Sequence, residues 1–197
     1  MRNSHRFRSF IQSFTRLVEQ FGGDEECIFA DGKKLLSELI SHDDWLPDDV
    51  AQPGLESYRQ HLLYCDPVEC FSVVSFVWGP GQATPVHDHT TWGIVGVMRG
   101  AEVCEEFELE PETGRLRSIG RHYVPTGGID LVSPRVGDIH KVSNALADRA
   151  SISIHVYGAD IGTVKRNIYE MESGCKKTLI SGYSSCVTPN IWDRSAE

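Results

Sequence analysis

Positive charge is scarce in this sequence, and long apolar runs are absent. The 197 residues include 19 Lys and Arg against 28 Asp and Glu, which gives a net charge of −9 at pH 7. Because nucleic-acid binding needs clustered Lys and Arg to neutralise phosphates, this balance argues against a nucleic-acid partner. No apolar run approaches the ~20 residues that span a bilayer, and no secretory apolar stretch follows the basic residues 1–8. We therefore expect a cytoplasmic protein with no membrane partner.

Cysteine pairs of the kind found in zinc ribbons or disulfide frameworks are also missing. None of the six cysteines forms a Cys-x-x-Cys motif, and their spacings are wide and irregular. This pattern is typical of free thiols, mostly buried, in a reducing compartment. The six residues are Cys27, Cys65, Cys70, Cys104, Cys175 and Cys186.

The N-terminal part of the chain carries two helical patterns. Phe10, Phe14, Leu17 and Phe21 recur at intervals of three and four residues, which places them on one face of a helix. A second helical pattern covers residues 35–40 and ends before a pair of aspartates. Nothing in these segments suggests catalysis, so we expect both helices to act in packing alone.

From about residue 56 the chain changes to short runs of β-branched and aromatic residues, such as residues 71–78 and 152–157. Turns rich in Gly and Pro separate these runs, and no helical pattern intervenes, which predicts an antiparallel sandwich or barrel. A chain of this length suits one domain. We expect a single, mainly β domain over residues 1–197. The helices of residues 1–55 would pack outside a β-barrel with a C-terminal extension, formed by residues 56–197.

Two histidines mark a candidate metal site within the β region. His87 and His89 are separated by one residue, so on a strand their side chains point to the same face and could bind one ion. Asp88 between them would point the other way, and we do not count it as a ligand. Five residues separate Gly81 from His87, and Gly93 follows His89 after three more. This spacing resembles the first sequence motif of the cupin family.

The second cupin motif also has a counterpart, and it supplies a third histidine. Gly137 and His140 follow Pro134 in the order of that motif, with one extra residue between Pro134 and Gly137. The two motifs together resemble the cupin family over roughly residues 71–158. The resemblance implies a double-stranded β-helix, or jelly-roll, barrel with a metal ion in its interior. The ligands that it implies are His87, His89 and His140.

Gly93 occupies the position at which the cupin motif usually supplies a glutamate ligand. Three neutral imidazoles then remain, with no carboxylate beside them. Such a site keeps positions open for a substrate and for dioxygen, and the charge of a divalent ion stays available to attract a thiolate. Zinc and manganese stay possible on ligand type alone, because three histidines do not by themselves select iron.

A row of polar side chains follows in the segment 151–157. Ser153, His155 and Tyr157 alternate with aliphatic residues, so all three would face the barrel interior. In functional terms they form a relay, in which Ser153 orients His155 and His155 hydrogen-bonds the Tyr157 hydroxyl. The alternative is a satisfied polar network that supports the barrel. No acidic third member or oxyanion hole is apparent, so a hydrolase pair is not expected.

The histidine triad and the Ser153-x-His155-x-Tyr157 row together resemble the cysteine dioxygenase family of thiol dioxygenases, over about residues 58–166. Members of that family use ferrous iron on three histidines to convert a thiol and O2 into a sulfinic acid. The resemblance therefore implies an Fe(2+) cofactor, with Tyr157, His155 and Ser153 as catalytic residues.

Two departures from the animal members indicate a branch. Gly93 stands where those enzymes carry a cysteine cross-linked to the active-site tyrosine, so no thioether to Tyr157 is expected. Gln60 stands in place of their carboxylate-binding arginine, and Arg59 falls on the opposite strand face. This combination resembles the bacterial glutamine-type branch. It implies a substrate such as 3-mercaptopropionate or L-cysteine, with Arg166 binding its carboxylate and Gln60 lining the pocket.

Two other functions remain open from the sequence. One is a different metal-dependent cupin enzyme, such as a ring-cleaving dioxygenase or an isomerase, which the polar row and Arg166 argue against. The other is a non-enzymatic cupin that binds a metal or ligand as a sensor, although no DNA-binding module accompanies the barrel. Trp92 is a candidate for an apolar pocket wall, with a core role as its alternative. The sequence leaves the oligomeric state open.

Overall fold

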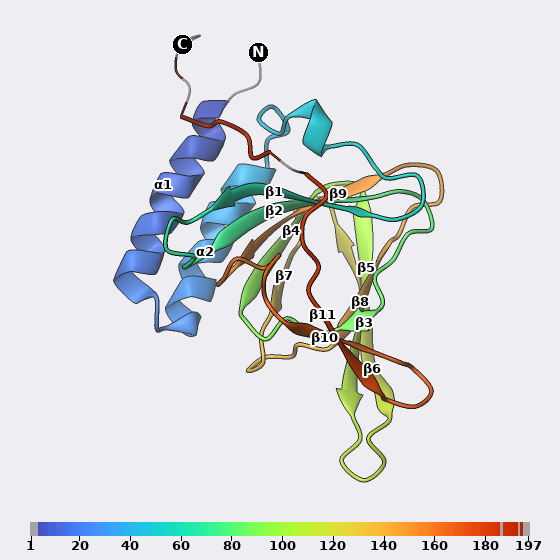
Figure 1. Cartoon of the computed structure of the whole chain (residues 1–197). Coiled ribbons are helices and arrows are strands. Elements are labelled where there is room, and N and C mark those ends of the chain that lie inside the picture. Colours follow the sequence, from blue (N-terminus) through green and yellow to red (C-terminus); the bar gives the residue numbers. More distant parts are fainter. Residues whose placement is uncertain (1–3, 186, 193, 195–197) are drawn as a thin grey trace.

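A computed structural model describes residues 4–185, 187–192 and 194, with two N-terminal helices beside two β-sheets (Figure 1). Helix α1 spans Ser4–Phe21 and helix α2 spans Glu25–Ile40. The apolar stripe of α1 is buried as predicted, although the helix begins six residues before its first member, Phe10. The start of α2 is fixed by Asp24, whose side chain accepts a hydrogen bond from the Cys27 N–H at 3.1 Å.

The strands form two sheets in which every pairing is antiparallel. The first sheet has the order β1 (Arg59–Cys65), β2 (Ser72–Trp78), β9 (Ser151–Tyr157), β4 (Gly93–Arg99) and β7 (Ile129–Val132). The second has the order β11 (Lys176–Leu179), β10 (Arg166–Tyr169), β3 (Val86–His87), β8 (His140–Asn144), β5 (Ala101–Leu109) and β6 (Leu116–Pro125). A short 3-10 helix, Asp48–Val50, lies in the connection from α2 to β1.

The first sheet has two buried faces, because helices cover one side and the second sheet faces the other (Figure 1). On β9, Ile154 and its aliphatic neighbours join the core beneath the helices, while Tyr157 belongs to the core between the sheets. This is the alternation of faces that the sequence predicted. The mainly β architecture with two helices outside it is confirmed.

Glycine allows α2 to pack closely on β4. A Cβ atom at Gly32 of the helix would lie 2.6 Å from the Ile94 side chain of the strand. A Cβ atom at Gly96 of the strand would lie 2.8 Å from the Ile40 side chain of the helix. A side chain at either position would push the tip of a buried isoleucine aside, so glycine lets the helix lie close to the sheet without that repacking.

The expectation for the cysteines holds only in part. The five cysteines within the described residues are free, but only Cys104 is buried, whereas Cys70 and Cys175 are exposed. The prediction of mostly buried thiols is therefore wrong, since isolated exposed cysteines carry no pattern that separates them from buried ones. Cys186 lies outside the described residues. The single-domain boundary stays a prediction.

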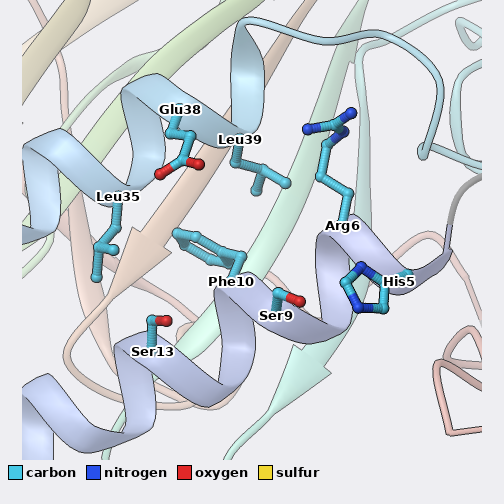
Figure 2. Close-up of a pocket in the computed structure, with 8 residues that line it drawn as sticks. All are labelled: His5, Arg6, Ser9, Phe10, Ser13, Leu35, Glu38 and Leu39. Atoms are coloured by element: carbon cyan, nitrogen blue, oxygen red, sulfur yellow. The ribbon is translucent and has the colours of Figure 1, made fainter.

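A surface groove of about 300 Å³ runs between α1 and α2 (Figure 2). Its walls include Arg6 and Phe10 from the first helix and Leu35 and Glu38 from the second. Neither helix is long and apolar enough to cross a membrane. The groups of metal-ligating side chains found among the described residues lie elsewhere, in the barrel.

Candidate metal centre

Three imidazole rings converge inside the barrel. His87 ends β3, His89 follows in the next loop, and His140 begins β8 directly opposite His87. The ring centroids are separated by 4.8 Å, 4.9 Å and 4.8 Å, and each side chain is at most 9% exposed. One ring nitrogen of each lies within 4.8 Å of the others, which is a suitable spacing for three ligands of one ion. The structure thus brings together the three histidines predicted as ligands.

The outward nitrogen of each ring has a partner. His87 Nδ1 lies 3.1 Å from the carbonyl oxygen of Pro85, and His89 Nδ1 lies 3.1 Å from a carboxylate oxygen of Asp138. Both partners can only accept, so both Nδ1 atoms donate, and Nε2 is the nitrogen of each ring that can bind a metal ion. His140 Nδ1 lies 3.5 Å from the Cys104 sulfur. Outer partners of this kind orient metal-binding histidines, and the donor set therefore fits a divalent ion.

The electrostatic setting keeps the His87 and His140 rings neutral. Burial, followed by the proximity of His89, lowers the pKa of both His87 and His140 well below the ordinary value of 6.5. A neutral imidazole is the form that binds a metal ion. The assignment of the three residues as ligands stays a prediction. The geometry of all three rings agrees with it, as does the neutral state of His87 and His140.

Asp138 anchors the loop that carries His89. Besides the ring of His89, its carboxylate accepts the backbone N–H of His89 at 2.9 Å and that of Thr90 at 3.1 Å. These bonds support Thr90 at a φ of 59°, a left-handed conformation that is uncommon outside glycine. Burial raises the pKa of Asp138, but the hydrogen bonds from His89 and Thr90 outweigh it, so the net shift is downward. Sequence reasoning missed this residue, whose only signal was its place two residues before His140.

Asp88 points away from the triad, in agreement with its exclusion as a ligand. Its carboxylate accepts hydrogen bonds from the backbone N–H and the side-chain amide of Asn167 and from the Tyr169 hydroxyl, each at 2.7 Å. Both of these residues belong to β10, which pairs with β3. The carboxylate therefore ties β10 to the strand that carries His87.

The polar row of β9 forms a continuous hydrogen-bonded chain. Ser153 Oγ lies 2.7 Å from His155 Nε2, and His155 Nδ1 lies 2.8 Å from the Tyr157 hydroxyl. All three side chains are buried, and Phe76 packs on the His155 ring at a centroid distance of 4.2 Å. The Tyr157 ring stacks on that of His89 at 5.5 Å and 20°. This hydrogen-bonded row of side chains thus ends beside the histidine triad.

Gly93 lies opposite Tyr157 on the neighbouring strand. A Cβ atom at this position would lie 2.7 Å from Cδ1 and 2.8 Å from Cε1 of the Tyr157 ring, and 2.8 Å from Val132. The ring therefore fills the space that a side chain at position 93 would need. Cys104, the buried thiol nearby, contacts His140 rather than Tyr157.

Arg166 and Gln60 meet at a residue that sequence reasoning did not identify. Arg166 Nη2 donates to Ser181 Oγ at 2.5 Å, and Gln60 Nε2 donates to the same oxygen at 3.2 Å and to the Gly182 carbonyl at 3.1 Å. Arg166 is only 5% exposed, and its Nε has no hydrogen-bond partner among the described residues. Ser181 lies in the C-terminal extension, where no motif marks it.

The Arg166 guanidinium influences the candidate metal centre electrostatically. After the larger effect of burial, its positive charge is among the causes that lower the pKa of His87 and His155, and it opposes the rise of the Tyr157 pKa. A buried cation with an unpaired N–H, near enough to influence His87 electrostatically, is a suitable binding group for an anion. Trp92, by contrast, packs near Phe14 of α1 and against Gly158, at the edge of the core beneath the helices. The structure therefore favours a packing role for Trp92 over a role as a pocket wall.

Residues 68–169, just over half of the chain, match the family described as cysteine dioxygenase type I. The chain belongs to the cysteine dioxygenase type I family. Its two-sheet barrel is a cupin fold, as predicted. With the histidine triad, membership makes it a metal-dependent cupin of a family whose reactants are a thiol and O2.

Three bacterial proteins are among the solved structures that are similar to this chain. TT1209 from Thermus thermophilus is 18% identical over 57% of this chain and 92% of its own, with a TM-score of 0.45. A protein with a double-stranded β-helix domain from Klebsiella pneumoniae is 17% identical over 66% and 99%, with a TM-score of 0.46. A Cupin 2 conserved barrel domain protein from Salinispora arenicola is 20% identical over 60% and 91%, with a TM-score of 0.43.

Proposed function

We propose that this protein is a non-haem iron thiol dioxygenase. It adds both atoms of O2 to the sulfur of a small thiol carboxylate, 3-mercaptopropionate or L-cysteine, and gives a sulfinic acid. The observation that carries the proposal is the convergence of three chemical groups in one barrel interior. These are the Nε2 atoms of the triad, the Tyr157 hydroxyl beside His89, and the unpaired Nε of Arg166.

The triad supports the choice of a thiol as substrate. His87, His89 and His140 would hold ferrous iron, which when bound supplies open positions for the thiolate and for dioxygen. Because the three ligands are neutral, they leave the positive charge of the site uncompensated, and this charge favours the thiolate over the thiol. Oxidation of the sulfur to the sulfinate is a two-oxygen change that needs no further reductant.

Arg166 supports the choice of a carboxylate on that thiol. Its planar guanidinium can bind a carboxylate through two parallel N–H donors, which a lysine cannot do. Ser181 already holds one terminal nitrogen, and Gln60 holds Ser181, so the guanidinium is oriented before substrate arrives. In this proposal Arg166 binds the substrate and Gln60 lines the pocket beside it.

Tyr157 can provide an oriented hydrogen-bond donor at the reacting end of the substrate. Its O–H would donate a hydrogen bond to the substrate, and His155 and Ser153 hold it in that direction. The pKa of Tyr157 is raised by burial, so the hydroxyl keeps its proton and acts as a donor rather than as a phenolate.

The test is oxygen uptake by the iron-loaded protein, followed by mass spectrometry of the product. We expect uptake with 3-mercaptopropionate or cysteine, and a product heavier than the substrate by two oxygen atoms. The zinc-loaded protein is the matched control and should consume no oxygen. Uptake with a catechol but with neither thiol would instead support a ring-cleaving cupin. The absence of uptake with any of the three, at full iron occupancy, would support a non-enzymatic metal-binding cupin.

A further inference from the structure

A buried carboxyl group lies at the far end of the Ser153–His155–Tyr157 chain. Glu102 of β5 is 2% exposed, and its side chain reaches from the second sheet to β9 of the first. It is within hydrogen-bond reach of Ser153 and of the Trp78 indole, and Ser151 Oγ lies 3.5 Å from its Oε1. None of its hydrogen-bond partners among the described residues is a candidate metal ligand. Glu102 thus extends the chain by one acidic member, which the sequence analysis did not expect.

The surroundings of Glu102 disfavour a negative charge. Apolar side chains from β4, β6 and β8 surround a cavity of about 10 Å³ beside the carboxyl, too small for more than about one water molecule. Burial raises the pKa of Glu102 to about 8, and it outweighs the hydrogen bonds with Ser153, Ser151 and Trp78, which lower the pKa; the charge of Asp130 adds a smaller upward effect. Three other titratable groups line the same cavity: Asp130 of β7, Cys104 of β5 and His140 of β8. Two more are connected through a neighbour: His122 of β6 is hydrogen-bonded to Asp130, and His155 of β9 is hydrogen-bonded to Ser153.

The direction of the hydrogen bonds depends on the proton of Glu102. The indole N–H of Trp78 can only donate, and it lies 3.3 Å from Ser153 Oγ. Burial lowers the pKa of His155 far below its ordinary value, so the ring carries a single N–H. If that proton is on Nδ1, the N–H donates a hydrogen bond to the Tyr157 oxygen. The Tyr157 O–H is then free to point at the metal centre.

In this arrangement the Ser153 proton must go to His155 Nε2. Ser153 then has no proton left for Glu102, so their contact is a hydrogen bond only if Glu102 donates. An ionised Glu102 would reverse the direction of every hydrogen bond in this series. Ser153 would donate to the carboxylate, His155 Nε2–H would donate to Ser153, and the Tyr157 O–H would turn to His155 Nδ1 and away from the metal centre.

We propose that Glu102 is a positioning residue, a neutral carboxylic acid that fixes the direction of hydrogen bonds through Ser153 and His155 so that Tyr157 presents its O–H to the metal centre. The use of that O–H in turnover rests on the proposed function. The direction itself is a property of the folded protein, and it can be measured without turnover.

The experiment determines the His155 tautomer by 15N NMR of the full chain loaded with diamagnetic zinc. We expect the Nδ1–H form in the wild type at about pH 6.5 and a change to the Nε2–H form at about pH 9.5, where Glu102 is ionised. Glu102→Gln stays neutral and keeps an N–H donor, so its His155 should remain Nδ1–H at both pH values. Glu102→Met, which also lacks an ionisable group, should lose the pH response too and serves if the amide variant does not fold.

Asp130→Asn is the matched control, because it removes the neighbouring acid and leaves Glu102 in place. We expect it to lower the pH at which the tautomer changes, without abolishing the change. A wild-type His155 that is Nε2–H at about pH 6.5 would overturn the proposal. So would a Glu102→Gln variant whose tautomer changes with pH as the wild type does.

Turnover gives a second readout with the iron-loaded protein and 3-mercaptopropionate. The ratio of kcat at about pH 9.5 to that at about pH 6.5 should be roughly tenfold higher in Glu102→Gln than in the wild type. Equal ratios would contradict a link between the tautomer and catalysis. If no thiol is oxidised but the tautomers behave as expected, the proposed function fails while the role of Glu102 in directing the chain stands.

Discussion

The buried carboxyl of Glu102 predicts a specific dependence of folding stability on pH. Its pKa is about 8 in the folded protein against an ordinary value of 4.5, which is the value expected in the unfolded chain. Between these two values the folded state holds a proton that the unfolded state has released. The stability supported by that proton is therefore complete below the lower value and is lost as the pH rises towards the higher one.

The magnitude follows from the linkage of one proton to unfolding. Each pH unit in this interval lowers the free energy of unfolding by about 1.4 kcal/mol for one bound proton. From about pH 5.5 to about pH 7.5, the release of this proton should therefore lower the free energy of unfolding of the wild type by roughly 2–3 kcal/mol. Glu102→Gln has no ionisable group at this position, so its free energy of unfolding should not fall for this reason.

The assay is urea unfolding of the metal-free full chain, wild type and Glu102→Gln, at the two pH values. Histidines and other carboxyls titrate in both proteins, so their effects cancel in the difference between the variants. We expect the difference in free energy of unfolding to shift by roughly 2–3 kcal/mol in favour of Glu102→Gln as the pH rises. Parallel pH profiles would refute the reasoning, because they would mean that Glu102 titrates alike in the folded and unfolded states.

Substitutions at four positions test the remaining assignments. His140→Ala should abolish stoichiometric iron binding, measured by metal analysis, together with activity. Tyr157→Phe should keep the iron but lower kcat by about tenfold or more, whereas full activity would remove the hydroxyl from the mechanism. Arg166→Ala should raise KM for 3-mercaptopropionate by about tenfold or more, with Arg166→Lys recovering little of it; an unchanged KM would contradict the carboxylate assignment. Gly93→Ala should force the Tyr157 ring to move and destabilise the fold by about 1–3 kcal/mol in urea unfolding, and no loss of stability would mean that the ring is not packed as described.

Features encoded by local periodicity could be predicted from the sequence. The alternation in β9 determines which side chains face the interior, and Ser153, His155 and Tyr157 form the expected chain there. There the relation between residues is set within one strand, so the pattern alone carries the information. His87 and His89 also meet as predicted, but β3 ends at His87, and the Asp138 carboxylate holds the His89 ring in the following loop.

Relations between distant strands could not be predicted in this way. Glu102 shares β5 with Glu105, Glu106 and Glu108, none of which is buried, and nothing in the local sequence distinguishes it from them. Its meeting with Ser153 depends on how the two sheets lie against each other. Ser181 likewise approaches Gln60 and Arg166 only because the C-terminal extension returns to β1.

The three hydrogen bonds that Asp88 accepts from β10 bear on which substrates fit. They fasten the strand that begins with Arg166 to the strand that ends with His87. In the proposed function the sulfur is held at one of these strands and the carboxylate at the other. The number of carbon atoms between thiol and carboxylate is then restricted by a side chain that touches neither end of the substrate. Loosening that connection should broaden the range of thiol chain lengths accepted, with the metal ligands and Arg166 all intact.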